Sequence, residues 1–266
     1  MNNEELKQLE EYDGEYKVVS NISKAEYYSS LPPVEPINIG LPLINEYLNG
    51  ITPGELIVIG GHPKSGKSTL ARTIIRNLSL AGNPPLVLSY EEPDDQLLTK
   101  FDNWSKDITF YMPNKMKAFD VNWVESRCLE AREKYGTLIT FVDHGQFLFE
   151  VTAQTNALTV GNAAKKIKNV ARENKIIIFL MWHLAKPDNK TVTLAQMNEH
   201  QLRDTQVLLN ELDSLILTYR GVKGDGIVQT EESYVKVQMT RRSGVYERIV
   251  PIEKVGNYFE EVGVYL

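Results

Sequence analysis

The sequence predicts an α/β fold in which a mostly parallel central sheet is flanked by helices. From about residue 37 onward, short runs of β-branched and aliphatic residues alternate with segments of helical spacing. Most of these runs are continuously apolar, as in strands that are buried on both faces. The alternation of strands with helices favours parallel pairing with helices on both sides of the sheet. With 266 residues, 42% of them hydrophobic, the chain can form one large core.

Each element follows from a local pattern. The predicted strands are LIVIG (56–60), PLVLSY (85–90), LITFVD (138–143), IIIFLMW (176–182) and DSLILTY (213–219). The predicted helices cover 68–81, 120–135 and 157–173. Gly82 and Gly136 follow the first two helices, and glycine is the usual left-handed residue just after a helix.

The two ends of the chain differ from this central part. Residues 1–36 are predicted to form an arm or linker, because NEELKQLEEY suits one short acidic helix and the three prolines of LPPVEP interrupt regular structure. Residues 37–266 are predicted to form the main domain. In its tail, YVKVQMT, YERIVPIEKV and YFEEV are separated by SG and GN, which indicates C-terminal antiparallel strands at the edge of the sheet.

Composition excludes several classes of protein. The net charge is −6 and no block of Lys and Arg stands out, so any nucleic-acid contact must be local. Cys128 is the one cysteine, which excludes an internal disulfide and a cysteine-based zinc site, and we expect it to be a buried, unreactive thiol. Since no apolar run reaches membrane-spanning length and the acidic N-terminus does not resemble a signal peptide, we expect no membrane contact and a cytoplasmic location.

The strongest motif is a phosphate-binding loop. Residues 61–68 match G-x-x-x-x-G-K-[ST] between a predicted strand and a predicted helix, where backbone N–H groups and the helix N-terminus can bind a polyphosphate. We expect ATP to be the ligand, with Lys67 on the β- and γ-phosphates and the Ser68 hydroxyl on Mg²⁺. The predicted nucleotide-binding residues are Gly61, His62, Pro63, Lys64, Ser65, Gly66, Lys67, Ser68 and Thr69.

Carboxylates follow two other strands. Asp143 ends LITFVD, where sheets of this class place ligand-facing residues, and a water-mediated contact to Mg²⁺ would explain it. Glu91 and Glu92 follow PLVLSY, and one of them could orient and deprotonate water. We favour Glu91 as the base and expect Glu92 to be solvated. The alternative for all three is that they cap helix N-termini.

The ordered set of motifs resembles the RecA-like motor of DnaB-family replicative helicases. The matching segments are NIGLPLINEYLNGITPGELIVIGGHPKSGKSTLA, LVLSYEE, FVDHGQFL, LMWHLAKP, QLRDTQVLLNELDSLILTYR and RRSG, which together span about 38–262. The resemblance implies a RecA-like P-loop ATPase and DNA helicase, with Glu91 as the catalytic glutamate. It also implies a hexameric ring on single-stranded DNA, 5′–3′ movement, a replication context in a bacterium, virus or plasmid, and a primase or loader as a further partner.

His183 matches the γ-phosphate sensor in the histidine-bearing branch of this family. A histidine at a strand end is more often a satisfied, half-buried residue, but its strand follows that of Asp143 in a P-loop protein. The long segment 186–205 after it could line the pore of a ring, with Lys186, Lys190 and Arg203 on DNA phosphates, or be a solvated loop. Lys165, Lys166 and Lys168 lie on a predicted helix and are expected to face solvent.

Arg241 and Arg242 precede Ser243-Gly244 and resemble the family's arginine-finger turn. A finger acts on the site of the neighbouring subunit, so hydrolysis would require assembly. Met239 and Thr240 stand where the family carries a lysine, both arginines fit the spacing, and a pair of surface arginines on a hairpin is the alternative.

Three functions fit these patterns. The first is a ring-forming helicase motor. The second is a RecA-like recombination or annealing ATPase without unwinding activity. The third is a KaiC-like regulatory assembly ATPase that does not contact nucleic acid.

Overall fold

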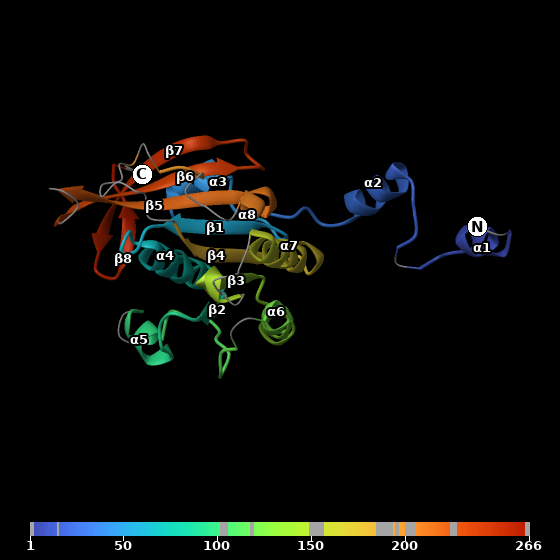
Figure 1. The fold of residues 1–266 in the computed structure, drawn as a ribbon, viewed down its shortest axis with the longest axis horizontal. Helices are drawn as coiled ribbons and strands as arrows, with labels where there is room; N and C mark the ends of the chain where they lie inside the picture. The colour runs from blue at the N-terminus through green and yellow to red at the C-terminus, as the bar shows by residue number, and fades with distance from the viewer. Residues whose placement is uncertain are drawn as a thin grey trace. The chain divides into compact units, whose positions relative to one another are not determined.

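The computed structural model describes residues 3–14, 16–101, 106–117, 120–148, 157–184, 194, 197–199, 206–223 and 228–263. Contacts divide the chain into two units, Met1–Glu35 and Pro36–Leu266. Figure 1 shows the larger unit as a single sheet with helices against it. Within the described residues, no helix has both the length and the apolar character needed to cross a membrane.

The first unit contains two short helices, α1 (Asn3–Glu10) and α2 (Asn21–Ser30). The acidic helix that the sequence predicts is α1. The second helix was not foreseen: Ser20 caps it by accepting a hydrogen bond from the Ser23 backbone N–H at 3.0 Å. A serine in extended conformation before a helical segment is the usual N-cap signal. The helix ends just before the proline-rich stretch LPPVEP.

The second unit is built on an eight-stranded sheet in the order β2-β3-β4-β1-β5-β6-β7-β8. The parallel part consists of β1 (Leu56–Gly61), β2 (Leu86–Ser89), β3 (Ile139–Asp143), β4 (Ile177–His183) and β5 (Ser214–Lys223). The antiparallel part consists of β6 (Val228–Thr240), β7 (Tyr246–Val255) and β8 (Tyr258–Glu261). This confirms the predicted fold class, a mostly parallel sheet with C-terminal antiparallel strands.

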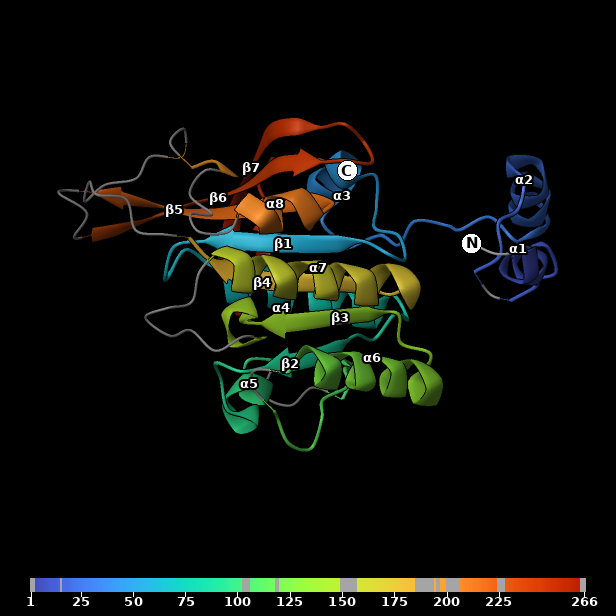
Figure 2. The same cartoon turned by 45° about the vertical axis from the view of Figure 1, so that its right-hand side comes forward.

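The helices of this unit cover both faces of the sheet, as Figure 2 shows. One face packs on α3 (Pro42–Leu48) and α4 (Lys67–Leu80), and the other packs on α6 (Val121–Tyr135), α7 (Ala157–Glu173) and α8 (Gln206–Glu211). The short α5 (Asp94–Thr99) and the 3₁₀ turn η1 (Gly145–Leu148) follow β2 and β3. Every residue of β1 is buried, as its continuous apolar run predicts.

Helix ends follow the predicted signals. Gly82 and Gly136 have φ values of 80° and 71°, so both are the left-handed residues expected after α4 and α6. The Asp120 side chain accepts a hydrogen bond from the Trp123 N–H at 3.0 Å and caps the start of α6. The predicted helices therefore occur within one residue of their expected bounds.

The register of the parallel strands brings distant residues to one edge. Gly61 at the end of β1 pairs with His183 at the end of β4, and Asp143 at the end of β3 pairs with Ser89 of β2. Ligands of open α/β sheets bind outside these carboxyl ends, where the connections leave a crevice. The fold thus places the ends of four strands around one site.

Cys128 supplies a test of the core packing. It is 2% exposed on α6, its Sγ lies 3.3 Å from Thr140 Oγ1, and burial raises the pKa of its thiol to about 11. Since the reactive form is the thiolate, native protein should not react with a thiol reagent such as DTNB, whereas protein unfolded in guanidinium should release one equivalent of chromophore.

The matched control places a second thiol at an exposed position of the same helix. Ser126→Cys should react rapidly in the native state, because Ser126 is exposed. Rapid labelling of Cys128 in native wild-type protein would contradict the packing of α6 against β3.

Candidate nucleotide-binding site

The predicted phosphate loop connects β1 to α4 at the carboxyl edge of the sheet. Gly66, with φ of 99°, precedes the first turn of α4, which begins at Lys67. Ser65 Oγ lies 2.7 Å from Thr218 Oγ1 and so joins the loop to β5. A Cβ on Gly61 would lie 2.3 Å from Ser65 Oγ and 2.4 Å from Thr218 Oγ1, so the side chain must be absent there for the loop to close.

Lys67 is almost fully buried, with 4% of its surface exposed. Its ammonium donates hydrogen bonds to the Gly61 carbonyl at 2.9 Å and the His62 carbonyl at 3.0 Å. Burial lowers the pKa of Lys67 to about 8, and the negative charges of Asp143 and Glu91 act in the opposite direction. The loop therefore holds a desolvated cation, which favours a strongly anionic ligand such as a polyphosphate.

Ser68 and Asp143 lie together beside this lysine. Ser68 Oγ is 3.4 Å from Asp143 Oδ2, and Asp143 Oδ1 is buried with no hydrogen-bond partner. Octahedral Mg²⁺ has oxygen ligands about 3 Å apart and keeps several waters, so one hydroxyl and one carboxylate suit it with a small adjustment. The donors predicted from sequence fit Mg²⁺ in chemistry and spacing.

The exposure of Glu91 and Glu92 is the reverse of the prediction, in which Glu92 was the solvated residue. Glu92 forms an ion pair with Lys100, and its side chain is 20% exposed, so it is not the solvated member. Glu91 is 47% exposed, and its Oε2 lies 2.5 Å from His144 Nε2. Neither carboxylate caps α5, whose N-cap residue Pro93 lacks a side-chain hydrogen bond. Of the two, Glu91 faces the other predicted catalytic groups.

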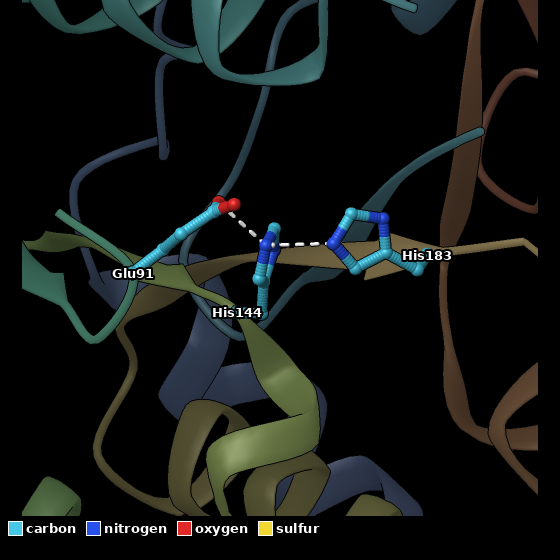
Figure 3. Close-up of side chains that lie close together, drawn as sticks. All are labelled: Glu91, His144 and His183. Atoms are coloured by element: carbon cyan, nitrogen blue, oxygen red, sulfur yellow. Dashed lines mark hydrogen bonds and ion pairs between the residues drawn. The ribbon is translucent and has the colours of Figure 1, made fainter. Parts of the chain in front are cut away.

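His183 and His144 meet between the strand ends. Their Nε2 atoms are 2.8 Å apart, and Figure 3 shows His144 between Glu91 and His183. Burial, followed by the positive charge of Lys67, lowers the pKa of His183 to about 4, so its imidazole is neutral at pH 7. No role for His144 was predicted, because its neighbours in the chain do not reveal a contact with residues 53 positions before and 39 positions after it.

These groups line a pocket of about 1140 Å³, whose second wall comes from β5 to β8. All residues from Pro63 to Thr69 line it. The opposite wall was not predicted, and it includes Arg220, Tyr234, Pro251, Glu253, Lys254 and Phe259. Arg72 of α4, which is 8% exposed, also reaches the pocket. A pocket of this size, with cations and aromatic rings on its walls, can hold a nucleoside triphosphate.

Arg241 and Arg242 lie at the other end of the sheet. Thr240 pairs with Ser214 at the start of β5, whereas the phosphate loop lies beyond the end of β1. Arg242 donates to the carbonyls of Leu48 at 3.0 Å and Asn49 at 2.8 Å, where α3 ends, and to Glu55 at 2.7 Å. Arg241 donates to the Asn210 carbonyl near the end of α8. Both therefore contact helix ends of their own chain and not its own phosphate loop.

None of the three predicted nucleic-acid contacts falls on a described residue. Lys186, Lys190 and Arg203 lie outside the described residues. Lys165 and Lys166 are exposed, as expected. Lys168 is not solvent-facing: its ammonium donates to Asp213 Oδ2 at 2.6 Å and to the Gly54 carbonyl at 2.8 Å, and the same carboxylate oxygen accepts from the Leu56 N–H at 2.7 Å. The helical pattern of α7 could not reveal this partner, because Asp213 is distant in sequence.

Gly66 gives a testable consequence of this geometry. A Cβ at this position would lie 2.7 Å from the Phe259 ring, and φ of 99° is strained for any L residue. Gly66→Ala should lower the free energy of unfolding through both the backbone strain and the clash with Phe259. The clash should add about 1–3 kcal/mol to the loss caused by the strain. Urea unfolding would measure the loss, and the thermal shift on adding ATP should also decrease.

Gly82→Ala is the matched control. Gly82 also has positive φ, of 80°, but an added Cβ there meets no atom within 4 Å. Equal destabilisation by the two substitutions would show that the contact between the loop and Phe259 does not constrain residue 66.

Comparison with known proteins supports the resemblance of the motifs. Residues 37–110 match the family described as the DnaB-like helicase C terminal domain. A replicative DNA helicase DnaB of Buchnera aphidicola subsp. Schizaphis graminum is 23% identical over 235 residues, which cover 77% of this chain and 50% of that protein. The DNA repair protein RadA of Campylobacter jejuni subsp. jejuni is 29% identical over 140 residues, or 52% of this chain and 30% of that protein. This chain spans about half the length of the helicase it matches, and less of RadA.

Solved structures agree with the fold. The ATPase domain of G40P superposes with a TM-score of 0.73 at 16% identity, over 91% of this chain and 96% of that one. A DnaB-like replicative helicase, studied with its interactions with primase, gives a TM-score of 0.70 at 16% identity, over 97% of this chain and 70% of that one. By sequence over residues 37–110 and by fold over more than nine-tenths of its length, this chain is similar to the C-terminal ATPase domain of DnaB-like helicases.

Proposed function

We propose that this chain is the ATP-hydrolysing motor domain of a ring-forming helicase that moves on single-stranded DNA. The observation that carries the proposal is the convergence of Lys67, Ser68, Asp143, Glu91 and His183 at one edge of the sheet. The similarity to DnaB-like domains supports the choice of motor over other ATPases. Since that similarity covers about half of the relative, substrate, assembly and partners belong to the proposal.

The residues divide the work of hydrolysis among them. The phosphate loop and Lys67 bind the β- and γ-phosphates through backbone N–H groups and one buried positive charge. Ser68 and Asp143 would hold Mg²⁺, which neutralises charge on the phosphate oxygens. Glu91 accepts the proton of the attacking water. We assign this role to Glu91 and not to Glu92 because Glu92 is paired with Lys100.

His183 suits the sensing of the γ-phosphate. Its imidazole is neutral at pH 7, so a ring N–H can donate to a phosphate oxygen without carrying a charge of its own. The chain continues from His183 into the segment that holds Lys186 and Lys190, which we propose contact DNA phosphates together with Arg203. In this proposal, loss of the γ-phosphate changes the position of the DNA-binding segment through His183.

A homo-oligomer completes the site in this proposal. Arg241 and Arg242 lie at the end of the sheet away from their own phosphate loop, as an arginine finger that acts on a neighbouring subunit requires. We propose a hexameric ring, with a primase or a loader as a further partner; the DnaB-like helicase of similar fold is described with its interactions with primase.

A second candidate is a RecA-like repair or recombination ATPase that does not unwind DNA. The similarity to RadA of Campylobacter jejuni, at 29% identity, favours it. Both candidates require DNA-stimulated ATP hydrolysis, and they differ in whether a forked duplex is separated.

Substitution of Lys67 and Glu91 tests hydrolysis. Lys67→Ala should abolish ATP turnover by removing the buried cation. Glu91→Gln should lower kcat by about 10²- to 10⁴-fold with little change in ATP affinity, because it removes a proton acceptor and not a phosphate contact. Phosphate release, with and without single-stranded DNA, measures turnover, and a labelled forked duplex measures unwinding.

Glu92→Gln is the matched control for Glu91→Gln. It changes the adjacent carboxylate, which contacts Lys100 and not His144, and should retain most of the turnover. A larger loss in Glu92→Gln than in Glu91→Gln would assign the base to the other residue. DNA-stimulated turnover without separation of the fork would favour the RadA-like candidate.

Mixed assemblies test the arginines. Arg241→Ala and Arg242→Ala should each lose turnover while still binding ATP, and mixing either with Lys67→Ala should restore part of the activity, because some interfaces then combine an intact loop with an intact arginine. Turnover at several mixing ratios measures the recovery.

Stability separates a finger from a structural arginine. Arg242→Ala removes an ion pair with Glu55 and the hydrogen bonds to the end of α3, and should also lower the melting temperature. Arg241→Ala removes contacts to two carbonyls of α8 and should show a smaller effect. Subunits that exchange freely but give no recovery would refute a finger in trans.

A further inference from the structure

Three side chains from different strand ends bring donor atoms together in the pocket. Glu91 follows β2, His144 follows β3 and His183 ends β4. His144 Nε2 lies 2.5 Å from Glu91 Oε2 and 2.8 Å from His183 Nε2, and all three donor atoms lie within 4.8 Å of one another. Figure 3 shows the Glu91 carboxylate and the His183 ring on either side of the His144 ring.

One hydrogen on His144 Nε2 can be aligned well with only one of these two neighbours. A ring nitrogen either carries a hydrogen and donates, or carries a lone pair and accepts. If His144 Nε2 donates to Glu91, it offers no lone pair to His183; if it accepts from His183, its lone pair faces the carboxylate oxygen. A cation accepts lone pairs from all three atoms at once.

The surroundings of His144 favour a lone pair on Nε2. Its Nδ1 lies 2.8 Å from Asp143 Oδ1, a short electrostatic contact that is not aligned as a hydrogen bond. The negative charge of this carboxylate favours the tautomer with the hydrogen on Nδ1, which leaves the lone pair on Nε2 free to coordinate. His144 is also 4% exposed, so its ring is held in place by packing.

We propose that Glu91, His144 and His183 form a binding site for a divalent transition-metal ion, separate from the Mg²⁺ ligands Ser68 and Asp143. Two imidazoles and one carboxylate suit Zn²⁺, Co²⁺ or Ni²⁺, whereas Mg²⁺ prefers oxygen ligands. Bonds of about 2.0–2.2 Å in tetrahedral geometry place ligand atoms roughly 3.3 Å apart. His144 Nε2 must therefore move away from the other two donor atoms by less than about 1 Å, and Glu91 and His183, whose donor atoms lie within 4.8 Å, must take the same spacing. Glu91, at 47% exposed, has room to make this movement.

Occupancy of the site would control the proposed ATPase. A bound ion holds the Glu91 carboxylate and the His183 ring, so neither can act on water or on the γ-phosphate. Micromolar Zn²⁺ should then inhibit turnover in excess Mg²⁺, and a chelator should reverse the inhibition. The site itself does not rest on hydrolysis, since it is defined by the ligands alone.

Cobalt binding tests the site without nucleotide. Full-length protein lacking any polyhistidine tag is freed of metal with a chelator, dialysed and titrated with Co²⁺, while visible d–d absorption is recorded. One equivalent should bind with the intense bands of a tetrahedral site, and Zn²⁺ should displace it. His144→Ala and Glu91→Gln should each weaken Co²⁺ binding at least about tenfold. Circular dichroism monitors folding.

His62→Ala is the matched control, because His62 is a phosphate-loop histidine near His183 that does not belong to the three-residue cluster. It should bind Co²⁺ as the wild type does. If His144→Ala fails to fold, the exposed Glu91→Gln decides the matter. Absence of one-equivalent binding in the wild type, or binding in Glu91→Gln as tight as in the wild type, would overturn the site. ATP turnover without Co²⁺ binding would remove only this site, and Co²⁺ binding without turnover would remove only the proposed function.

Discussion

The buried ammonium of Lys67 is the charge on which the pocket depends. Lys67 is the first residue of α4, and its ammonium donates to the Gly61 carbonyl at the end of β1. Only 4% of the residue is exposed, and this desolvation lowers its pKa to about 8. A buried charge is tolerated only with polar partners, which here are two loop carbonyls and the nearby carboxylates of Asp143 and Glu91. The same charge helps to keep His183 neutral. The electrostatics of the site therefore follow from one lysine that the sheet and α4 hold in place.

The antiparallel tail completes the pocket from the other side. The Phe259 N–H donates to Thr73 Oγ1 at 2.8 Å, which joins β8 to α4. The Glu261 carboxylate accepts from the backbone N–H groups of Leu43 and Ile44 at 2.8 and 2.9 Å, at the start of α3. Residues near the C-terminal end of the described chain thus stabilise the first helix of the larger unit. A truncation within β8 would remove both contacts.

The arginines near the turn after β6 connect assembly with folding. Arg242 satisfies carbonyl groups at the end of α3, which would otherwise lack partners, and also neutralises the 9% exposed Glu55. For Arg242 to reach a neighbouring nucleotide, it must exchange these contacts for phosphate oxygens. Arg241 donates to the Leu209 and Asn210 carbonyls in α8 and would lose fewer contacts. In a ring, contact with a neighbouring nucleotide would therefore cost Arg242 more contacts inside its own subunit than it would cost Arg241.

The sequence by itself determined the mostly parallel sheet with its antiparallel tail, the bounds of α4, α6 and α7 to within a residue, the phosphate loop and the strand-end positions of Asp143 and His183. These follow from local spacing and from the rule that parallel strands end at one edge. Only the tertiary structure decided that His144 joins Glu91 to His183, that Glu92 is paired with Lys100, that Lys168 is bonded to Asp213, and that Phe259 closes the loop at Gly66. Each of these contacts except the Glu92–Lys100 pair joins residues at least 39 positions apart, and none leaves a periodic signal, so they arise from packing and strand register and not from local propensity.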